Sequence, residues 1–143
     1  MFIGREKELS ILTQQYESNQ FEFTVLYGRR RIGKTQLLKE FIKDRNSIYY
    51  MAIDAGFSTN LELLSKAIYE YTKESKHLSS FSDFDQMFHY ITDIAKKERI
   101  ILIIDEYPYL AQSTSEISSM IQKFCDHEWK DTKLHLILCG SSM

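Results

Sequence analysis

Two kinds of apolar pattern alternate along the chain. Short runs dominated by apolar residues predict strands at 21–27, 47–53, 100–104 and 134–139. Between them, apolar residues recur every three or four positions, which predicts amphipathic helices. Strands that alternate with helices indicate an α/β fold with a mostly parallel sheet.

The starts of the helices are predicted from capping residues. A first helix is expected over residues 5–17 and a second from near Gly33. The next three are expected to begin at a Thr59–Glu62 capping box, at Ser82 or Asp83, and at Ser113 with Glu116. The strand at 100–104 is apolar without alternation, so both of its faces should be covered, as at the centre of a parallel sheet.

Residues 28–35 carry the most specific chemical signal. Gly28-Arg29-Arg30-Arg31-Ile32-Gly33-Lys34-Thr35 matches the pattern G-x-x-x-x-G-K-[ST], between a predicted strand and a predicted helix. In such a loop the glycines let backbone N–H groups point at phosphate oxygens, and the helix adds its positive end. The lysine neutralises the β- and γ-phosphates, and the threonine hydroxyl is a Mg²⁺ ligand. We therefore expect residues 28–36 to bind ATP, with Gln36 as the last contributor.

The tripeptide of arginines makes this loop unusually basic. Arg29, Arg30 and Arg31 could bind phosphate, an acidic partner or nucleic acid, although such side chains more often point to solvent while the backbone contacts the phosphates. None of the three is assigned as an arginine finger.

A pair of acids ends the most hydrophobic strand. Asp105 is expected to hold Mg²⁺ opposite Thr35, and Glu106 to act as general base toward the attacking water. The alternative is that both acids merely solvate a strand end, which the phosphate loop disfavours.

Composition narrows the setting. The chain has 143 residues, 43% of them hydrophobic, and a formal net charge of −2, so it has no overall basic surface for nucleic acid. Two cysteines without C-x-x-C spacing and no apolar run long enough for a bilayer predict a cytoplasmic protein with no membrane partner.

Four motifs in order resemble the archaeal ATPase family, a P-loop group related to AAA+ and STAND ATPases. They lie at residues 2–9, 26–35, 103–110 and 138–142, so the resemblance runs over the whole chain. It implies a three-layer α/β/α fold of the P-loop NTPase type, with strand order 5-1-4-3-2. The fifth strand would be absent, so residues 1–143 are expected to be an ATPase domain truncated after its fourth core strand.

The resemblance also implies roles for residues outside the phosphate loop. Phe2, Ile3 and Gly4 would lie near the adenine, and Ser141 would sense the γ-phosphate. From the residues alone, Ser141 could equally belong to a flexible polar tail. Lys34, Glu106 and Ser141 are thus the candidate catalytic residues.

Three functions remain open at this stage. The first is Mg²⁺-dependent ATP binding with hydrolysis, slow in the isolated chain. The second is a nucleotide-gated switch that hydrolyses little, and the third is a DNA-associated module. Self-association is a further expectation, because the first strand would have an open edge. Nucleic acid is expected to bind only through parts outside these residues.

Overall fold

The computed structural model describes residues 6–29, 33–74 and 79–142. All pairings in its four-stranded sheet are parallel, and the strand order is β1-β4-β3-β2. The strands are β1 (Glu22–Arg29), β2 (Ser47–Met51), β3 (Ile100–Asp105) and β4 (Leu134–Ser142). This order confirms the predicted sequence of the first four strands, with β1 and β2 at the edges of the described sheet.

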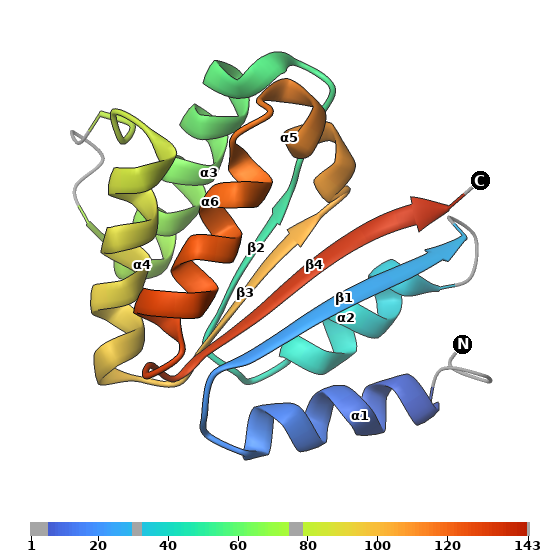
Figure 1. The fold of residues 1–143 in the computed structure, drawn as a ribbon. Coiled ribbons are helices and arrows are strands. Elements are labelled where there is room, and N and C mark those ends of the chain that lie inside the picture. The colour runs from blue at the N-terminus through green and yellow to red at the C-terminus, as the bar shows by residue number, and fades with distance from the viewer. Residues whose placement is uncertain (1–5, 30–32, 75–78, 143) are drawn as a thin grey trace.

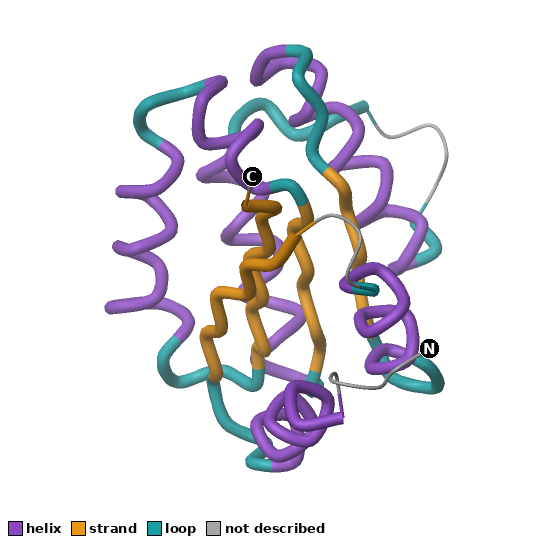
Figure 2. Tube along the Cα trace, turned by 90° about the vertical axis from the view of Figure 1, so that its right-hand side faces the viewer, coloured by secondary structure: helices purple, strands orange, loops and turns teal. Residues whose placement is uncertain are grey.

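Helices cover both faces of the sheet, which gives the three layers seen in Figures 1 and 2. One face carries α1 (Glu6–Glu17) and α2 (Lys34–Ile42). The other face carries α3 (Gly56–Thr72), α4 (Phe84–Lys97), α5 (Tyr107–Ser113), α6 (Ile117–Phe124) and the π-helical turn η1 (Cys125–Trp129).

Each face has its own hydrophobic core. Because successive strand residues point to opposite faces, Ile101 and Ile103 pack against α1 and α2, while Ile100, Leu102 and Ile104 pack under α3–α6. Every residue of β3 is buried, which confirms that this strand is covered on both sides.

Of the five predicted helix starts, those of α1, α2 and α4 are confirmed. Asp83 caps α4 by accepting a hydrogen bond from the Gln86 N–H, 2.8 Å away. The Thr59–Glu62 capping box is wrong, because α3 already begins at Gly56. Ser113 ends α5, a helix that the sequence pattern did not predict, whereas α6 begins directly after Glu116, so the last predicted start is right at Glu116 and wrong at Ser113.

Candidate functional site

The candidate site lies at the edge of the sheet where β1, β3 and β4 end. Lys34 is the first residue of α2, Asp105 is the last residue of β3, and Ser141 is the second-last residue of β4. Gly28 in β1 is paired with Ser141, so the phosphate loop leaves the sheet beside the end of β4. Parallel strands thus bring together residues that are more than one hundred positions apart.

Gly33 makes the turn from the loop into α2. Its φ of 73° lies in the left-handed region, which glycine adopts without steric cost. The Gly33 carbonyl accepts the Leu37 N–H at 2.8 Å, so the helix is established immediately after the turn. The N-terminal end of α2, with its partial positive charge, therefore faces the site.

Lys34 is the cation of this site and is only 4% exposed. Its Nζ lies 3.1 Å from Asp105 Oδ1 and donates a hydrogen bond of 3.1 Å to Ser141 Oγ. A buried charge needs such partners, because loss of hydration costs several kcal/mol. Lys34 therefore contacts both strands that the sequence analysis assigned to the site.

Glu106 is held beside this cation by a different bond. Ser141 Oγ donates to Glu106 Oε2 at 3.0 Å, so one hydroxyl joins the lysine and the glutamate. Glu106 has a φ of 51°, a left-handed conformation that is uncommon for residues other than glycine and that often occurs at functional sites. Ser141 belongs to a strand, so the alternative of a flexible polar tail does not apply to it.

Asp105 is completely buried and fully engaged. Besides Lys34, its Oδ1 accepts the Glu106 N–H at 2.8 Å. Its Oδ2 accepts the Tyr49 hydroxyl at 2.6 Å. Burial, and then the hydrogen bond to Asp105, raise the pKa of Tyr49, so the phenol remains a donor at neutral pH.

Sequence reasoning missed Tyr49. It lies in the middle of β2 in a run that reads as an ordinary strand, and no spacing links it to Asp105. Only the β2–β3 pairing brings it to the site. Cys139 of β4 is buried in the core on the same face of the sheet, and burial raises the pKa of its thiol to about 12, so the thiol stays neutral.

The predicted Mg²⁺ ligands come from adjacent elements of this edge. Thr35 follows Lys34 in the first turn of α2 and is exposed, and Asp105 contacts Lys34 directly. Oxygen donors of this kind fit Mg²⁺, which binds through one or two protein ligands together with phosphates and water. Gln36 is also exposed at the start of α2.

Several predicted contacts lie outside the described residues. These are the predicted adenine contacts Phe2, Ile3 and Gly4, and the loop residues Arg30, Arg31 and Ile32.

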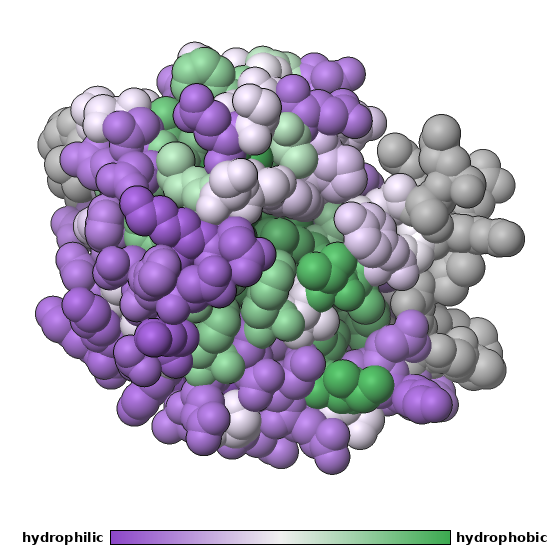
Figure 3. Space-filling model, viewed as in Figure 1, coloured by the Kyte–Doolittle hydropathy of each residue, from purple (hydrophilic) through white to green (hydrophobic). Residues whose placement is uncertain are grey.

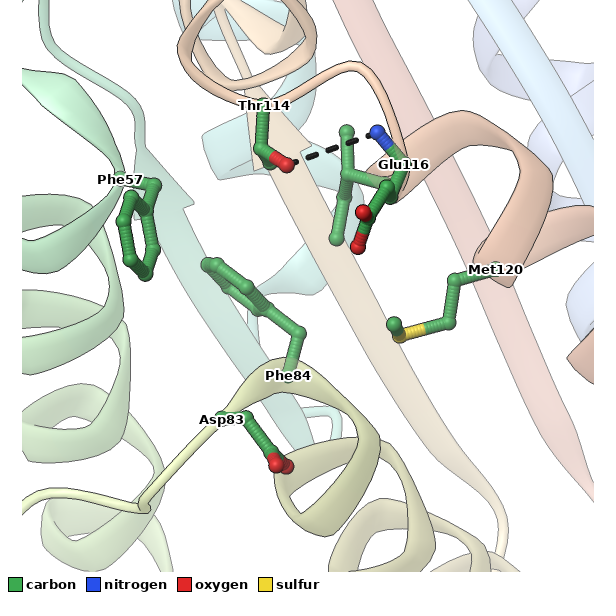
Figure 4. A pocket seen from close by; sticks show the side chains of 7 residues that line it. Phe57, Asp83, Phe84, Thr114, Glu116 and Met120 are labelled. Carbon is green, nitrogen blue, oxygen red and sulfur yellow. Dashed lines mark hydrogen bonds between the residues drawn. The ribbon is translucent and has the colours of Figure 1, made fainter.

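A separate pocket lies among the helices, as Figure 4 shows. It has a volume of about 300 Å³ and is bounded by the N-terminal ends of α3 and α4 and by the α5–α6 segment. Its lining residues are Phe57, Asp83, Phe84, Thr114, Glu116, Ile117 and Met120. The lining includes neither Lys34 nor any of the residues that contact it, so this pocket is distinct from the site at Lys34, and none of its residues was predicted as a site residue.

The strand order and the glycine-rich turn into α2 define the P-loop ATPase fold. Within that class, residues 2–143 match the family described as an ATPase domain predominantly from Archaea, and the chain belongs to this family. The resemblance inferred from the four motifs is thereby confirmed.

Relatives of this chain occur in Methanocaldococcus jannaschii. An uncharacterized protein is 36% identical over 146 aligned positions, which cover 100% of this chain and 30% of the relative. An uncharacterized ATP-binding protein is 42% identical over 45 positions, which cover 32% of this chain and 76% of that protein. The chain thus spans about a third of the length of the first relative.

Solved structures share the fold. The Walker-type ATPase of Pyrococcus abyssi superposes with a TM-score of 0.66 at 21% identity, over 95% of this chain and 44% of that one. The ORC2 protein of Aeropyrum pernix, in ADPNP–ADP complexes, superposes with a TM-score of 0.70 at 16% identity, over 96% of this chain and 41% of that one.

In the part of the chain that the structure describes, no helix is long and apolar enough to cross a membrane.

Proposed function

We propose that this chain binds Mg-ATP and hydrolyses it, as an ATPase domain related to AAA+ and STAND ATPases. One observation carries the proposal: Lys34, Asp105, Ser141 and Glu106 form a single chain of contacts of 3.1 Å or less at the exit of the phosphate loop. Membership of an ATPase-domain family and the ATP-binding relative support nucleotide binding at this place.

Each residue has a role in the proposed reaction. The backbone of residues 28–35 and the Lys34 ammonium hold the β- and γ-phosphates. Thr35 and Asp105 hold Mg²⁺, which neutralises charge on the phosphate oxygens when bound. Glu106 accepts a proton from water as the water oxygen bonds to the γ-phosphorus and the bond to the bridging oxygen of ADP breaks.

Ser141 suits the role of a γ-phosphate sensor. Its hydroxyl contacts both Lys34 and Glu106, so a phosphate that draws Lys34 away also changes the surroundings of the general base. The same contact favours the second candidate, a nucleotide-gated switch in which Glu106 stays bound to Ser141 and turnover is minimal.

The general base is the point at which the two candidates differ. Glu106→Gln keeps a side chain of similar shape that cannot take up the proton, so ATP binding should persist while phosphate release falls about 10²–10⁴-fold. Glu116→Gln, an exposed glutamate outside the site, is the control and should behave as wild type. Equally fast phosphate release from the wild type and Glu106→Gln would reject Glu106 as the base, and ATP binding with equally minimal release from both would favour the switch.

A further inference from the structure

Tyr49 reaches the candidate site from the far edge of the sheet. It lies in β2 and faces the α2 side, where it packs against the core that contains Leu37 and Ile103. Its register partner in β3 is Ile103, two residues before Asp105. The phenol therefore extends along the sheet toward the carboxyl edge, and its hydroxyl ends 2.6 Å from Asp105 Oδ2.

The two oxygens of Asp105 have different partners. Oδ1 lies next to Lys34 Nζ and accepts the Glu106 N–H. Lys34 follows the phosphate loop directly, and Glu106 is the proposed general base. Among the hydrogen bonds of the described residues, Oδ2 receives only Tyr49. The Lys34 and Glu106 contacts hold Oδ1 in place. The hydrogen bond from Tyr49 holds Oδ2, so the carboxylate cannot rotate freely.

We propose that Tyr49 is the positioning residue for the Mg²⁺-binding carboxylate of Asp105. This role rests on the proposed function, since it gives Asp105 its task there. A hydrogen bond from a hydroxyl to a carboxylate at this distance is among the stronger kinds in proteins. Partners that orient a metal-binding carboxylate in this way affect metal affinity without touching the metal.

This role of Tyr49 predicts that its loss changes the Mg²⁺ dependence of ATP binding and leaves ATP binding without Mg²⁺ unchanged. Without the phenol hydroxyl, Oδ2 loses its donor in a completely buried position, and the carboxylate is free to turn toward another partner. The phosphate loop and Lys34 are unchanged, so the affinity for ATP without Mg²⁺ should be unchanged. The Mg²⁺ concentration needed for half-maximal stimulation of ATP binding should rise.

Tyr49→Phe tests this, because it removes one oxygen and keeps the ring. The control is Tyr50→Phe, the neighbouring strand residue, whose hydroxyl bonds Asn60 on the opposite face. For each variant of the 143-residue chain, ATP affinity is titrated in EDTA and at increasing Mg²⁺, and the melting temperature is recorded. Tyr49→Phe should raise the half-stimulating Mg²⁺ concentration about tenfold, with unchanged affinity in EDTA. Tyr50→Phe should leave both values unchanged.

A double variant separates positioning from a general loss of structure. In an Asp105→Asn background, Tyr49→Phe should have no further effect on the Mg²⁺ dependence. An equal Mg²⁺ dependence for Tyr49→Phe and wild type, or an undiminished effect in the Asp105→Asn background, would overturn the role of Tyr49 alone. A wild-type chain that binds no ATP would overturn the proposed function and this role together.

Discussion

Lys34 and Asp105 form a buried ion pair whose two members come from different motifs of the sequence. Their attraction offsets the loss of hydration that each charge suffers in the interior. The pair therefore orders the site before any phosphate arrives. We expect Lys34 to exchange or share its partners when a phosphate binds, while Asp105 keeps the bonds that Glu106 and Tyr49 donate to it.

His135 shows a different use of a buried polar residue. It lies in β4 with 0% exposure, its ring packs edge-on against Phe41, and its Nε2 lies 3.3 Å from Gln15 Oε1. Burial and the nearby Arg99 lower the pKa of His135 from 6.5 to about 4. The folded chain thus keeps this imidazole neutral under conditions in which an unfolded chain would protonate it.

The sign of the resulting pH dependence follows. Between pH 6.5 and 4 the unfolded chain binds a proton that the folded chain excludes, so this contribution to stability is complete above pH 6.5 and is lost as the pH falls. From pH 7 to pH 5 the loss should be about 2 kcal/mol. His135→Leu should be less sensitive to acid by that amount in urea unfolding. An equal loss of stability in both proteins would contradict the assignment.

At the scale of elements, the sequence pattern predicted what depends on local periodicity. All four strands and the phosphate-loop helix were anticipated, because residues 100–104 of β3 are all apolar and Leu37, Leu38 and Phe41 recur at helical spacing. The short α5 and the turn η1 were missed. The segment that forms α5 is only seven residues long, and Glu106 begins it in a left-handed conformation that no periodicity reveals.

The residues of the candidate site likewise fall into two groups: those that local motifs predicted and those that depend on the assembled sheet. Lys34, Asp105 and Glu106 were predictable because their motifs encode local backbone geometry. The Ser141 hydroxyl was placed there by resemblance, and Tyr49 was not found at all. Its contact with Asp105 depends on β2 lying next to β3 and on the register that pairs Tyr49 with Ile103, two residues before Asp105. Both are properties of the assembled sheet.

Asn60 fixes the connection from β2 to α3 and was also absent from the sequence prediction. Its amide bonds the Ile53 N–H and carbonyl, both at 3.0 Å, and the Gly56 carbonyl at 2.8 Å. These contacts stabilise the start of a helix that has no side-chain cap.

Asn60→Ala should therefore cost about 2 kcal/mol of unfolding free energy, because it leaves the buried Tyr50 hydroxyl and the backbone groups of Ile53 and Gly56 without these partners. Asn46→Ala, which removes one exposed side-chain bond to Glu98, should stay within about 0.5 kcal/mol of wild type. Chemical denaturation measures both. A loss of similar size in the two variants would show that Asn60 does not fix this connection.

At the scale of the molecule, the helices leave β1 uncovered on the α3–α6 side. Phe23, Val25 and Tyr27 all face this side and are 42%, 51% and 61% exposed. Figure 3 shows a hydrophobic area on the face turned to the viewer, over the region of β1 and β4. β1 is also an edge of the described sheet, so apolar side chains and unpaired backbone groups coincide there.

We expect the 143-residue chain to associate with a second copy through β1. Light scattering should give a mass that rises with protein concentration, and Val25→Lys should suppress that rise by placing a charge on the apolar stripe. Ile11→Lys, at an exposed residue of α1 on the other side of the sheet, should leave it unchanged. A constant monomeric mass for the wild type at all concentrations would contradict this expectation.

The central claim concerns Lys34, because it joins the phosphate loop to Asp105 of β3 and to Ser141 of β4. The most direct test is an equilibrium titration of Mg-ATP with wild type, Lys34→Ala and Lys39→Ala, in which Lys39 is an exposed lysine of the same helix. Wild type and Lys39→Ala should bind with equal affinity, and Lys34→Ala should show no detectable binding while it remains folded. A folded Lys34→Ala protein that binds Mg-ATP as tightly as wild type would contradict the assignment of this site.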